Sequence, residues 1–313
     1  MHLKKIEIKG LTIKNNALLA PLAGYTNPVF RAMCEGLGAG LTFTEMVSAK
    51  GLCYNSENTR GLLALTTTYG GINAVQLFGS EPEYMRRAAL SVDIAPFDLI
   101  DINMGCPVPK IFKNGEGSAL LADIPRAQKL VGAASAGGKP VSVKFRIGLD
   151  CNHIVTRDFA VAMRDAGACM LTVHGRTRDK MYSGEVDFKE IAAAKAAVDI
   201  PVIANGGVFS DADAERLLNE TGADGVMVAR GAMYNPFIFA ELTNTPVADK
   251  KAVIRKQLYD TFAVFGERFA TVYMRKMLGF YIKGQAGASS TRVKLLSCNS
   301  LKEIEQILNT INF

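Results

Sequence analysis

The stretch Asp98-Leu-Ile-Asp-Ile-Asn-Met-Gly-Cys-Pro107 changes character halfway along. Its first half is rich in bulky aliphatic residues and is too short for an independent helix, which predicts a buried strand. Gly105 and Pro107 interrupt the strand pattern, so Asn103 and Cys106 are expected just past the strand's carboxyl end. A thiol on a loop beside a rigid strand end suits chemistry, although a lone cysteine is more often a buried packing residue.

Strand-like and helix-like segments alternate along the chain on both sides of this stretch. Strands are expected at residues 17–20, 41–45, 73–78, 99–103, 141–145, 169–174, 202–205 and 225–229. Helical patterns between them include residues 28–37, 83–92, 118–135, 157–166, 188–197 and 211–220. This rhythm predicts an α/β fold of the (β/α)8 TIM-barrel type, and residues 6–15 predict a hairpin that closes its bottom. A doubly wound sheet would instead place Gly-x-Gly-x-x-Gly after its first strand, where this chain has Pro21-Leu-Ala-Gly24.

The rhythm changes after Asn244-Thr-Pro246, and no strand pattern returns. Helices are expected at residues 249–265, 267–283 and 300–312, with a loop at 284–290. We therefore expect a barrel domain over residues 1–244 and a small all-α domain over residues 245–313.

The basic excess of the chain lies in this last part. The whole chain has 36 Lys and Arg against 30 Asp and Glu, a net charge of +6. Residues 246–313 hold 11 basic and 5 acidic residues, which leaves 25 of each in the remainder. A basic appendix on a neutral barrel indicates a polyanionic partner, and a solvated helical face is the alternative.

Composition narrows the class of protein further. The six cysteines form no Cys-x-x-Cys pair and histidines number only three, so no metal site is expected. The cysteine usage and the absence of an uninterrupted apolar start predict a reducing, cytoplasmic setting. No apolar run of 18 residues appears, so we expect no membrane span. No feature predicts a stable protein partner.

Unusual polar residues fall at the carboxyl ends of the expected strands. In a barrel these ends meet on one rim, where active sites lie. The residues concerned are Gln76, Asn103, Cys106, Lys144, Arg146, His174, Asn205-Gly-Gly207 and Ala229-Arg-Gly231. Together they predict one shared site.

Two groups of these residues indicate the kind of ligand. The glycines after strands seven and eight, with Arg230, suit a phosphate, and two tight turns are the alternative. Lys144 in an apolar strand needs a partner, and Gln76 is a buried amide with the same need. A flavin ring satisfies both, whereas a buried salt bridge is the other possibility for Lys144.

Several motifs resemble the signature of the tRNA-dihydrouridine synthase family over nearly the whole chain. They are Ala20-Pro-Leu-Ala-Gly-Tyr-Thr-Asn27, Asn103-Met-Gly-Cys-Pro107, Lys113-Asn-Gly-Glu-Gly117, Ser118-Ala-Leu-Leu121, Thr172-Val-His-Gly-Arg-Thr-Arg178 and Arg275-Lys-Met-Leu-Gly-Phe-Tyr-Ile-Lys-Gly284. The resemblance implies an enzyme that uses FMN, with NADPH or NADH as reductant, to reduce specific uridines in tRNA to dihydrouridine. It implies FMN-binding roles for Pro21, Leu22, Ala23, Gln76, Lys144, His174, Asn205, Gly206, Gly207, Ala229 and Arg230.

The same resemblance implies a mechanism, in which a hydride passes from flavin N5 to uracil C6 while Cys106 protonates C5 from the opposite face. The target uridine must first leave its stack. Substrate-binding residues are then expected on the rim and in the tail: Asn103, Arg176, Arg178, Lys110, Lys113, Arg275, Lys276 and Lys283. The alternatives are an FMN barrel that oxidises or reduces a small molecule, as dihydroorotate dehydrogenase does, and a non-catalytic RNA-binding protein.

Overall fold

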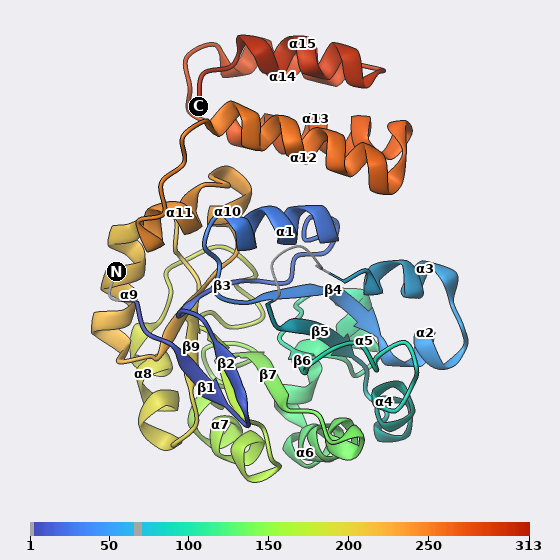
Figure 1. Ribbon diagram of the computed structural model, residues 1–313. Helices are drawn as coiled ribbons and strands as arrows, with labels where there is room; N and C mark the ends of the chain where they lie inside the picture. The colour runs from blue at the N-terminus through green and yellow to red at the C-terminus, as the bar shows by residue number, and fades with distance from the viewer. Residues whose placement is uncertain (1–2, 66–70) are drawn as a thin grey trace.

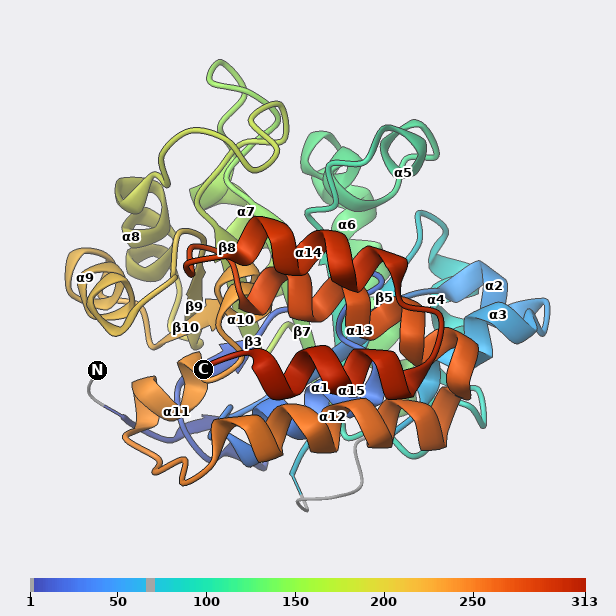
Figure 2. The same cartoon turned by 90° about the horizontal axis from the view of Figure 1, so that it is seen from above.

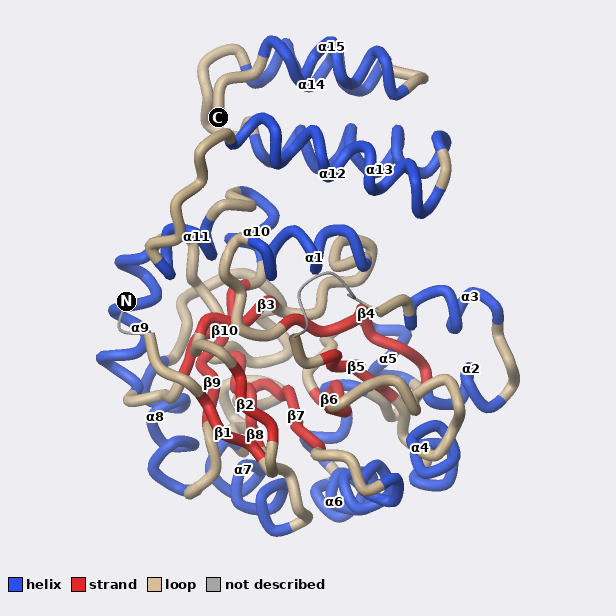
Figure 3. The backbone as a smooth tube through the Cα atoms, viewed as in Figure 1, coloured by secondary structure: helices blue, strands red, loops and turns tan. Residues whose placement is uncertain are grey.

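The barrel strands form one parallel sheet that closes on itself. The computed structural model describes residues 3–65 and 71–313. Its sheet has the order β3-β10-β9-β8-β7-β6-β5-β4, and a parallel bridge between Leu18 and Leu41 joins the two edge strands. The strands are β3 (Ala17–Leu19), β4 (Thr42–Ser48), β5 (Asn73–Phe78), β6 (Leu99–Met104), β7 (Val141–Arg146), β8 (Met170–His174), β9 (Val202–Asn205) and β10 (Gly225–Val228). The expected TIM barrel and all eight of its strands are confirmed (Figure 3).

A two-stranded hairpin closes the amino-terminal end of the barrel. Strands β1 (Ile6–Ile8) and β2 (Leu11–Ile13) pair antiparallel around Lys9 and Gly10, which both have positive φ, as a tight hairpin turn requires. Ile6, Ile8 and Ile13 are buried against apolar side chains from inside the barrel. The expected closing hairpin is therefore present, and it leaves the opposite end for the site.

Helices surround the barrel and bury a second, larger apolar core against the outer face of its strands. The longer ones are α1 (Pro28–Gly36), α4 (Pro82–Ala89), α6 (Ile124–Ala134), α7 (Thr156–Asp165), α8 (Phe188–Ala197), α9 (Asp211–Thr221) and α11 (Ile238–Thr243). Short helices lie in the loops: α2 (Ala49–Cys53), α3 (Glu57–Arg60), α5 (Pro109–Lys113), α10 (Arg230–Tyr234) and the 3-10 turns Gly61–Leu63, Gly117–Ala122 and Ser135–Gly137.

The single helix expected over residues 118–135 is wrong. The structure has the 3-10 turn Gly117–Ala122 and then a separate helix, α6, whose N-cap is Asp123. The Asp123 side chain accepts a hydrogen bond from the Arg126 N–H, and Pro125 lies in the first turn, where its missing N–H costs nothing. These two residues start a new helix instead of continuing an old one.

Four further helices follow the barrel and lie together on one side of it. They are α12 (Lys250–Phe265), α13 (Glu267–Tyr281), α14 (Ala288–Ser297) and α15 (Leu301–Thr310). Figures 1 and 2 show α12 and α13 between the barrel and the outer pair, α14 and α15. The loop expected at 284–290 ends early, because helix α14, which the sequence did not predict, starts at Ala288. The only buried residue of α14 is Leu295, so this helix has no apolar stripe by which the sequence could have indicated it.

No helix in the described part of the chain is long and apolar enough to cross a membrane.

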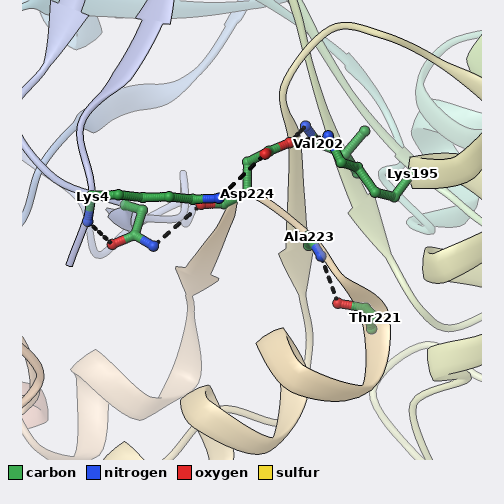
Figure 4. Close-up of polar contacts among 7 residues, drawn as sticks. Lys4, Lys195, Val202, Thr221, Ala223 and Asp224 are labelled. Atoms are coloured by element: carbon green, nitrogen blue, oxygen red, sulfur yellow. Dashed lines mark hydrogen bonds and ion pairs between the residues drawn. The ribbon is translucent and has the colours of Figure 1, made fainter. Parts of the chain in front are cut away.

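One carboxylate joins three elements at the bottom of the barrel, as Figure 4 shows. Asp224 accepts hydrogen bonds from Lys4 Nζ at 3.3 Å, from Lys195 Nζ at 2.7 Å and from the Val202 N–H at 2.8 Å. Partial burial alone would raise the pKa of Asp224, but the hydrogen bonds from Lys195 and Val202 and the charges of Lys195 and Lys4 outweigh it and lower the pKa. The ionised form therefore stabilises the closed barrel.

Replacing Asp224 with Asn should lower the free energy of unfolding at pH 7 by about 1–2 kcal/mol, because both lysines lose their charged partner. The folded pKa is below the unfolded value of about 3.9, so this contribution is complete above that value and is lost as the pH falls through the folded pKa. Urea unfolding of both proteins between pH 7 and pH 3 measures it. Asp165→Asn, which breaks an exposed pair with Arg164, is the control and should leave the midpoint unchanged. Equal losses in the two variants would contradict the role of Asp224.

Candidate active site

The loops at the carboxyl ends of the strands enclose one cavity. Of the residues expected at the site, Pro21, Leu22, Ala23, Asn103, Cys106, Lys144, His174, Arg176, Asn205, Gly206, Gly207, Ala229 and Arg230 line it. The rim position of these side chains follows from the parallel register, in which Asn103 pairs with Lys144, Arg146 with His174, and His174 with Asn205. Residues more than 200 positions apart in the sequence thus share one wall.

The loop that carries Cys106 is fixed by its own strand end. The Oδ1 atom of Asn103 accepts hydrogen bonds from the N–H groups of Gly105, at 3.1 Å, and Cys106, at 2.9 Å. On the other side of the loop, the Ser118 hydroxyl donates to the Cys106 carbonyl at 2.8 Å. Gly117, with φ of 59°, packs so closely that a Cβ there would lie 2.9 Å from the Cβ of Cys106. The thiol is therefore held in place and half-buried.

Burial raises the pKa of the Cys106 thiol, and a backbone hydrogen bond near Val108 and the charges of Arg146 and Lys144 only partly oppose it. A raised pKa keeps the thiol protonated at neutral pH, so the side chain can donate a proton. It is unsuited to the role of a standing nucleophile, which needs the thiolate.

A chain of buried polar groups inside the barrel orients Asn103. Asp101 accepts from Ser142 Oγ at 2.6 Å and from Gln76 Nε2 at 2.7 Å, and Gln76 Oε1 accepts from Asn103 Nδ2 at 2.9 Å. Burial raises the pKa of Asp101 to about 6, against the effect of its two donors and of Lys144. Each amide is thereby locked in one orientation, which leaves the Asn103 oxygen facing the Cys106 loop.

The side chain of Gln76 does not lie where the sequence predicted. Its side chain is fully buried and does not line the cavity. It contacts Asn103, which does line the cavity, and so it supports the wall from behind. Its predicted direct contact with a cofactor stays a prediction.

Lys144 is one of the residues that line the cavity. Burial, with a smaller effect from Arg146, lowers the pKa of its ammonium group to about 8, so the group is mostly charged at pH 7. Within the described residues, no acceptor lies at hydrogen-bond distance from Lys144 Nζ and no carboxylate forms an ion pair with it. The buried salt bridge considered for Lys144 is therefore not found in this part of the chain.

Three more cations and a neutral imidazole complete that wall. Arg146, Arg176 and Arg230 line the cavity, and the lining contains no Asp or Glu. Burial and the charges of Lys144 and the three arginines lower the pKa of His174 well below its usual value, so the ring is neutral. Arg176 Nη1 lies 3.4 Å from His174 Nε2, and an arginine can only donate, so this nitrogen is the acceptor. The cavity therefore favours an anionic ligand.

The two glycines after β9 make room at one end of the cavity. Gly206 has φ of 123° and Gly207 has φ of 76°, conformations that other residues rarely adopt. A Cβ on Gly206 would lie 3.0 Å from Val186 Cγ2 and 3.2 Å from His174 Cδ2. The Asn205 amide donates to the Met227 carbonyl at 2.7 Å, which joins the glycine turn to β10 just before Arg230.

Arg146 has a structural role at the site that the sequence did not predict. It was expected at a strand end, but it was not included among the binding residues. Arg146 Nε donates to the Gly105 carbonyl at 2.9 Å and Nη1 donates to the Thr177 carbonyl at 3.0 Å. It therefore holds the Cys106 loop and the loop after β8 together. The signal was available, because Lys144 and Arg146 are two residues apart and so lie on the same face of β7.

The remaining basic residues lie outside the cavity. Lys110 and Lys113 are exposed on α5, and the guanidinium of Arg178 lies 3.7 Å over the Phe112 ring. In the tail, Arg275 donates to the carbonyls of Leu296 and Cys298, both at 3.0 Å, so it ends α14.

Two more tail cations contact the barrel. Lys276 donates to the Gly24 carbonyl at 2.7 Å, and Lys283 Nζ lies 4.2 Å from the centre of the Tyr234 ring. The structure therefore does not bring Lys110, Lys113, Arg178, Arg275, Lys276 or Lys283 into the cavity.

Comparison with known proteins agrees with this arrangement. The family model described as "Dihydrouridine synthase (Dus)" matches residues 18–312. A protein of Synechocystis sp. named "Probable tRNA-dihydrouridine synthase 1" is 36% identical, over 98% of this chain and 89% of its own length. The "tRNA-dihydrouridine synthase B" of Pseudomonas putida is 34% identical, over 96% of this chain and 91% of its own.

Among solved structures, the histamine dehydrogenase of Rhizobium sp. 4-9 shares the barrel fold, with a TM-score of 0.60 and 14% sequence identity over 82% of this chain. This chain spans about half of that longer chain, 50% of its length. A family match over nearly the full length, with Cys106, Lys144 and the glycine turn on one cavity, establishes that this chain belongs to the dihydrouridine synthase family.

Proposed function

We propose that this chain is a tRNA-dihydrouridine synthase that uses FMN and NADPH or NADH to reduce the C5–C6 double bond of specific uridines in tRNA. The observation that carries the proposal is the position of Cys106, a half-buried thiol whose pKa burial raises, on the same cavity as a set of cations and a glycine turn. A proton donor beside an anion-binding cavity is what the reduction of a carbon–carbon double bond next to a phosphorylated cofactor requires.

The donor set of the cavity fits FMN. Lys144, Arg146, Arg176 and Arg230 face it without a carboxylate among the lining residues, and Lys144 Nζ has no acceptor within the described part of the chain. The phosphate of FMN is an anion that Arg230 and the N–H groups of Gly206 and Gly207 would hold. The ring portion is planar and largely apolar, which suits the wall formed by Pro21, Leu22 and Ala23.

The polar edge of the cofactor would meet Lys144, with Asn103 and His174 beside it. The ammonium group of Lys144 would stabilise negative charge that develops near it, because a charge on a half-buried side chain acts more strongly than one in bulk water. The neutral His174 ring and the oriented Asn103 amide supply hydrogen bonds of fixed direction. Gln76 contributes through Asn103.

When bound, the flavin supplies the hydride that C6 of the uracil takes up. Cys106 donates its Sγ proton to C5, and the resulting thiolate recovers a proton from solvent, so one hydride and one proton saturate the double bond. The backbone that carries the thiol is held from both sides by Asn103 and Ser118.

A nicotinamide cofactor would use the same entrance. The sequence contains no Gly-x-Gly-x-x-Gly turn after a strand, so we expect NADPH, or NADH, to bind over the cavity briefly and leave before tRNA arrives.

The tRNA substrate accounts for the basic tail. We assign residues 1–244 to a catalytic barrel domain and residues 245–313 to a helical tRNA-binding domain, which holds the whole basic excess of the chain. The target uridine must be flipped out of its stack to reach the cavity, at a cost of a few kcal/mol. The exposed residues Lys110, Lys113 and Lys283 are the candidates for phosphate contacts. The reaction would take place in the cytoplasm.

Replacing Cys106 with Ala should lower the rate of dihydrouridine formation about 10²- to 10⁴-fold, because the general acid is lost. The purified variant should still show flavin absorbance, since Cys106 is not among the residues that would hold the cofactor. Mass spectrometry of tRNA nucleosides measures the product. Cys151→Ala, at an exposed cysteine outside the cavity, should behave as the parent does. A fully active Cys106→Ala protein would rule out the thiol as proton donor.

The rate of uridine reduction should fall at alkaline pH, because the acid must be in its thiol form. Burial raises the pKa of Cys106, so half of the rate should be lost only above the ordinary thiol value of about 8.5. Single-turnover reduction of tRNA by the pre-reduced enzyme is followed from pH 6 to 10. Lys144, with a pKa of about 8, titrates in the same range, so the series is repeated with Lys144→Arg, which stays charged. A decline still centred below pH 8 in Lys144→Arg would contradict the assignment.

Reversing the charge of Lys113 should weaken tRNA binding and reduce the slope of log K against log salt by about 1, if this lysine contacts a phosphate. Oxidation of NADPH in the absence of tRNA should be unchanged. Lys5→Glu is the matched control, because Lys5 is equally exposed but lies at the hairpin end of the barrel. Filter binding at several salt concentrations gives both slopes, and identical slopes for the two variants would exclude the contact.

A further inference from the structure

The loop after β3 forms one wall of the cavity and also touches the helical tail. Pro21, Leu22 and Ala23 line the cavity, and the next two residues, Gly24 and Tyr25, contact α13. Figures 1 and 2 show α13 on the inner layer of the tail, next to the barrel. The tail therefore meets the cavity wall directly.

Polar groups hold the backbone of Gly24 from two directions. Glu45, from β4, accepts a hydrogen bond from the Gly24 N–H. Lys276, from α13, donates to the Gly24 carbonyl at 2.7 Å. Gly24 has φ of 76°, so the loop turns sharply at the point where these two contacts meet.

Tyr25 extends the same contact along α13. The Nζ atom of Lys276 lies 4.0 Å from the centre of the Tyr25 ring and 5.4 Å from the centre of the Tyr273 ring. The Tyr273 hydroxyl donates to the Tyr25 carbonyl at 2.8 Å. One turn of α13 thus makes two hydrogen bonds to consecutive carbonyls of the loop and a cation–π contact with it.

Lys276 is exposed as a residue, and its amino group nevertheless points to these contacts on the barrel side. Partial burial lowers the pKa of this group, against the opposing effect of the Glu45 charge. An RNA phosphate would have to compete with the Gly24 carbonyl and with two aromatic rings for the same ammonium group. The role of a phosphate contact, expected from the sequence, therefore fits Lys276 less well than a role in the wall.

We infer that Lys276 is a positioning residue for the cofactor site: by holding Gly24 and Tyr25 it sets the loop that walls the cavity. The inference rests on the proposed function for the nature of the ligand, FMN. It makes the tail part of the cofactor site, in addition to any part that it has in binding tRNA. Removing the ammonium group should loosen the loop and weaken FMN binding, whereas tRNA binding should change only as far as any lost tail charge changes it.

The test compares Lys276→Met with Lys302→Met, which removes the same charge from an exposed position on α15. Lys276→Met should raise the dissociation constant for FMN about fivefold to tenfold in a fluorescence titration, and Lys302→Met should not change it. Activity of Lys276→Met should recover at saturating FMN. Lys276→Arg, which keeps a donor and a cation, should restore most of the affinity, and tRNA affinity should fall equally in the two Met variants.

Two outcomes would overturn the inference. One is an unchanged FMN dissociation constant in Lys276→Met; if tRNA affinity then falls more than in Lys302→Met, Lys276 is an RNA contact. The other is an unchanged rate of amide hydrogen exchange at residues 22–25 in Lys276→Met, since a loop released from α13 must exchange faster. The exchange measurement needs no cofactor, so it distinguishes this failure from failure of the proposed function, in which the parent protein would bind no FMN. Tyr273→Phe tests the same loop independently and should raise the dissociation constant in the same direction.

Discussion

A single amide side chain connects the interior of the barrel to its reactive loop. Asn103 receives its orientation from Gln76, which receives its own from Asp101, and it passes this orientation to the N–H groups of Gly105 and Cys106. Buried polar groups must be satisfied, because each unmade hydrogen bond costs about 1–3 kcal/mol. The network therefore has one favourable arrangement, and in that arrangement the Cys106 loop is rigid before any ligand binds.

The cavity is positively charged because its lining contains basic residues and no carboxylate. Four cations line it and no carboxylate does, so an anion that enters has no internal carboxylate to displace. Burial, together with the same cations, lowers the pKa of His174 and keeps its ring neutral, whereas burial of Cys106 outweighs the effect of Arg146 and Lys144 and raises the pKa of the thiol. One local environment thus favours a neutral imidazole, a protonated thiol and a charged amine, three states that suit the proposed reduction of a double bond beside an anionic cofactor.

The helical tail makes specific contacts with the barrel as well as carrying the basic excess of the chain. Arg275 ends a neighbouring helix, and Lys276 and Tyr273 hold the loop that walls the cavity. Basic side chains of the tail can therefore stabilise the fold and the cavity wall, in addition to binding a polyanion. A count of basic residues measures the potential around the tail but cannot assign each charge a partner.

The sequence by itself determined the barrel, because periodic apolar strands and helices alternate and parallel strands bring their carboxyl ends to one rim. It therefore also determined that Cys106, Lys144, His174, the glycine turn and Arg230 share a site. Only the tertiary structure decided which way polar side chains at that rim point. Gln76 turns inward to Asn103, Arg146 joins two loops, and Lys276 reaches across to Gly24, 252 residues away. The reason is physical: periodicity encodes which face of an element is apolar, whereas the partner of a polar group depends on distances between segments that meet only after folding.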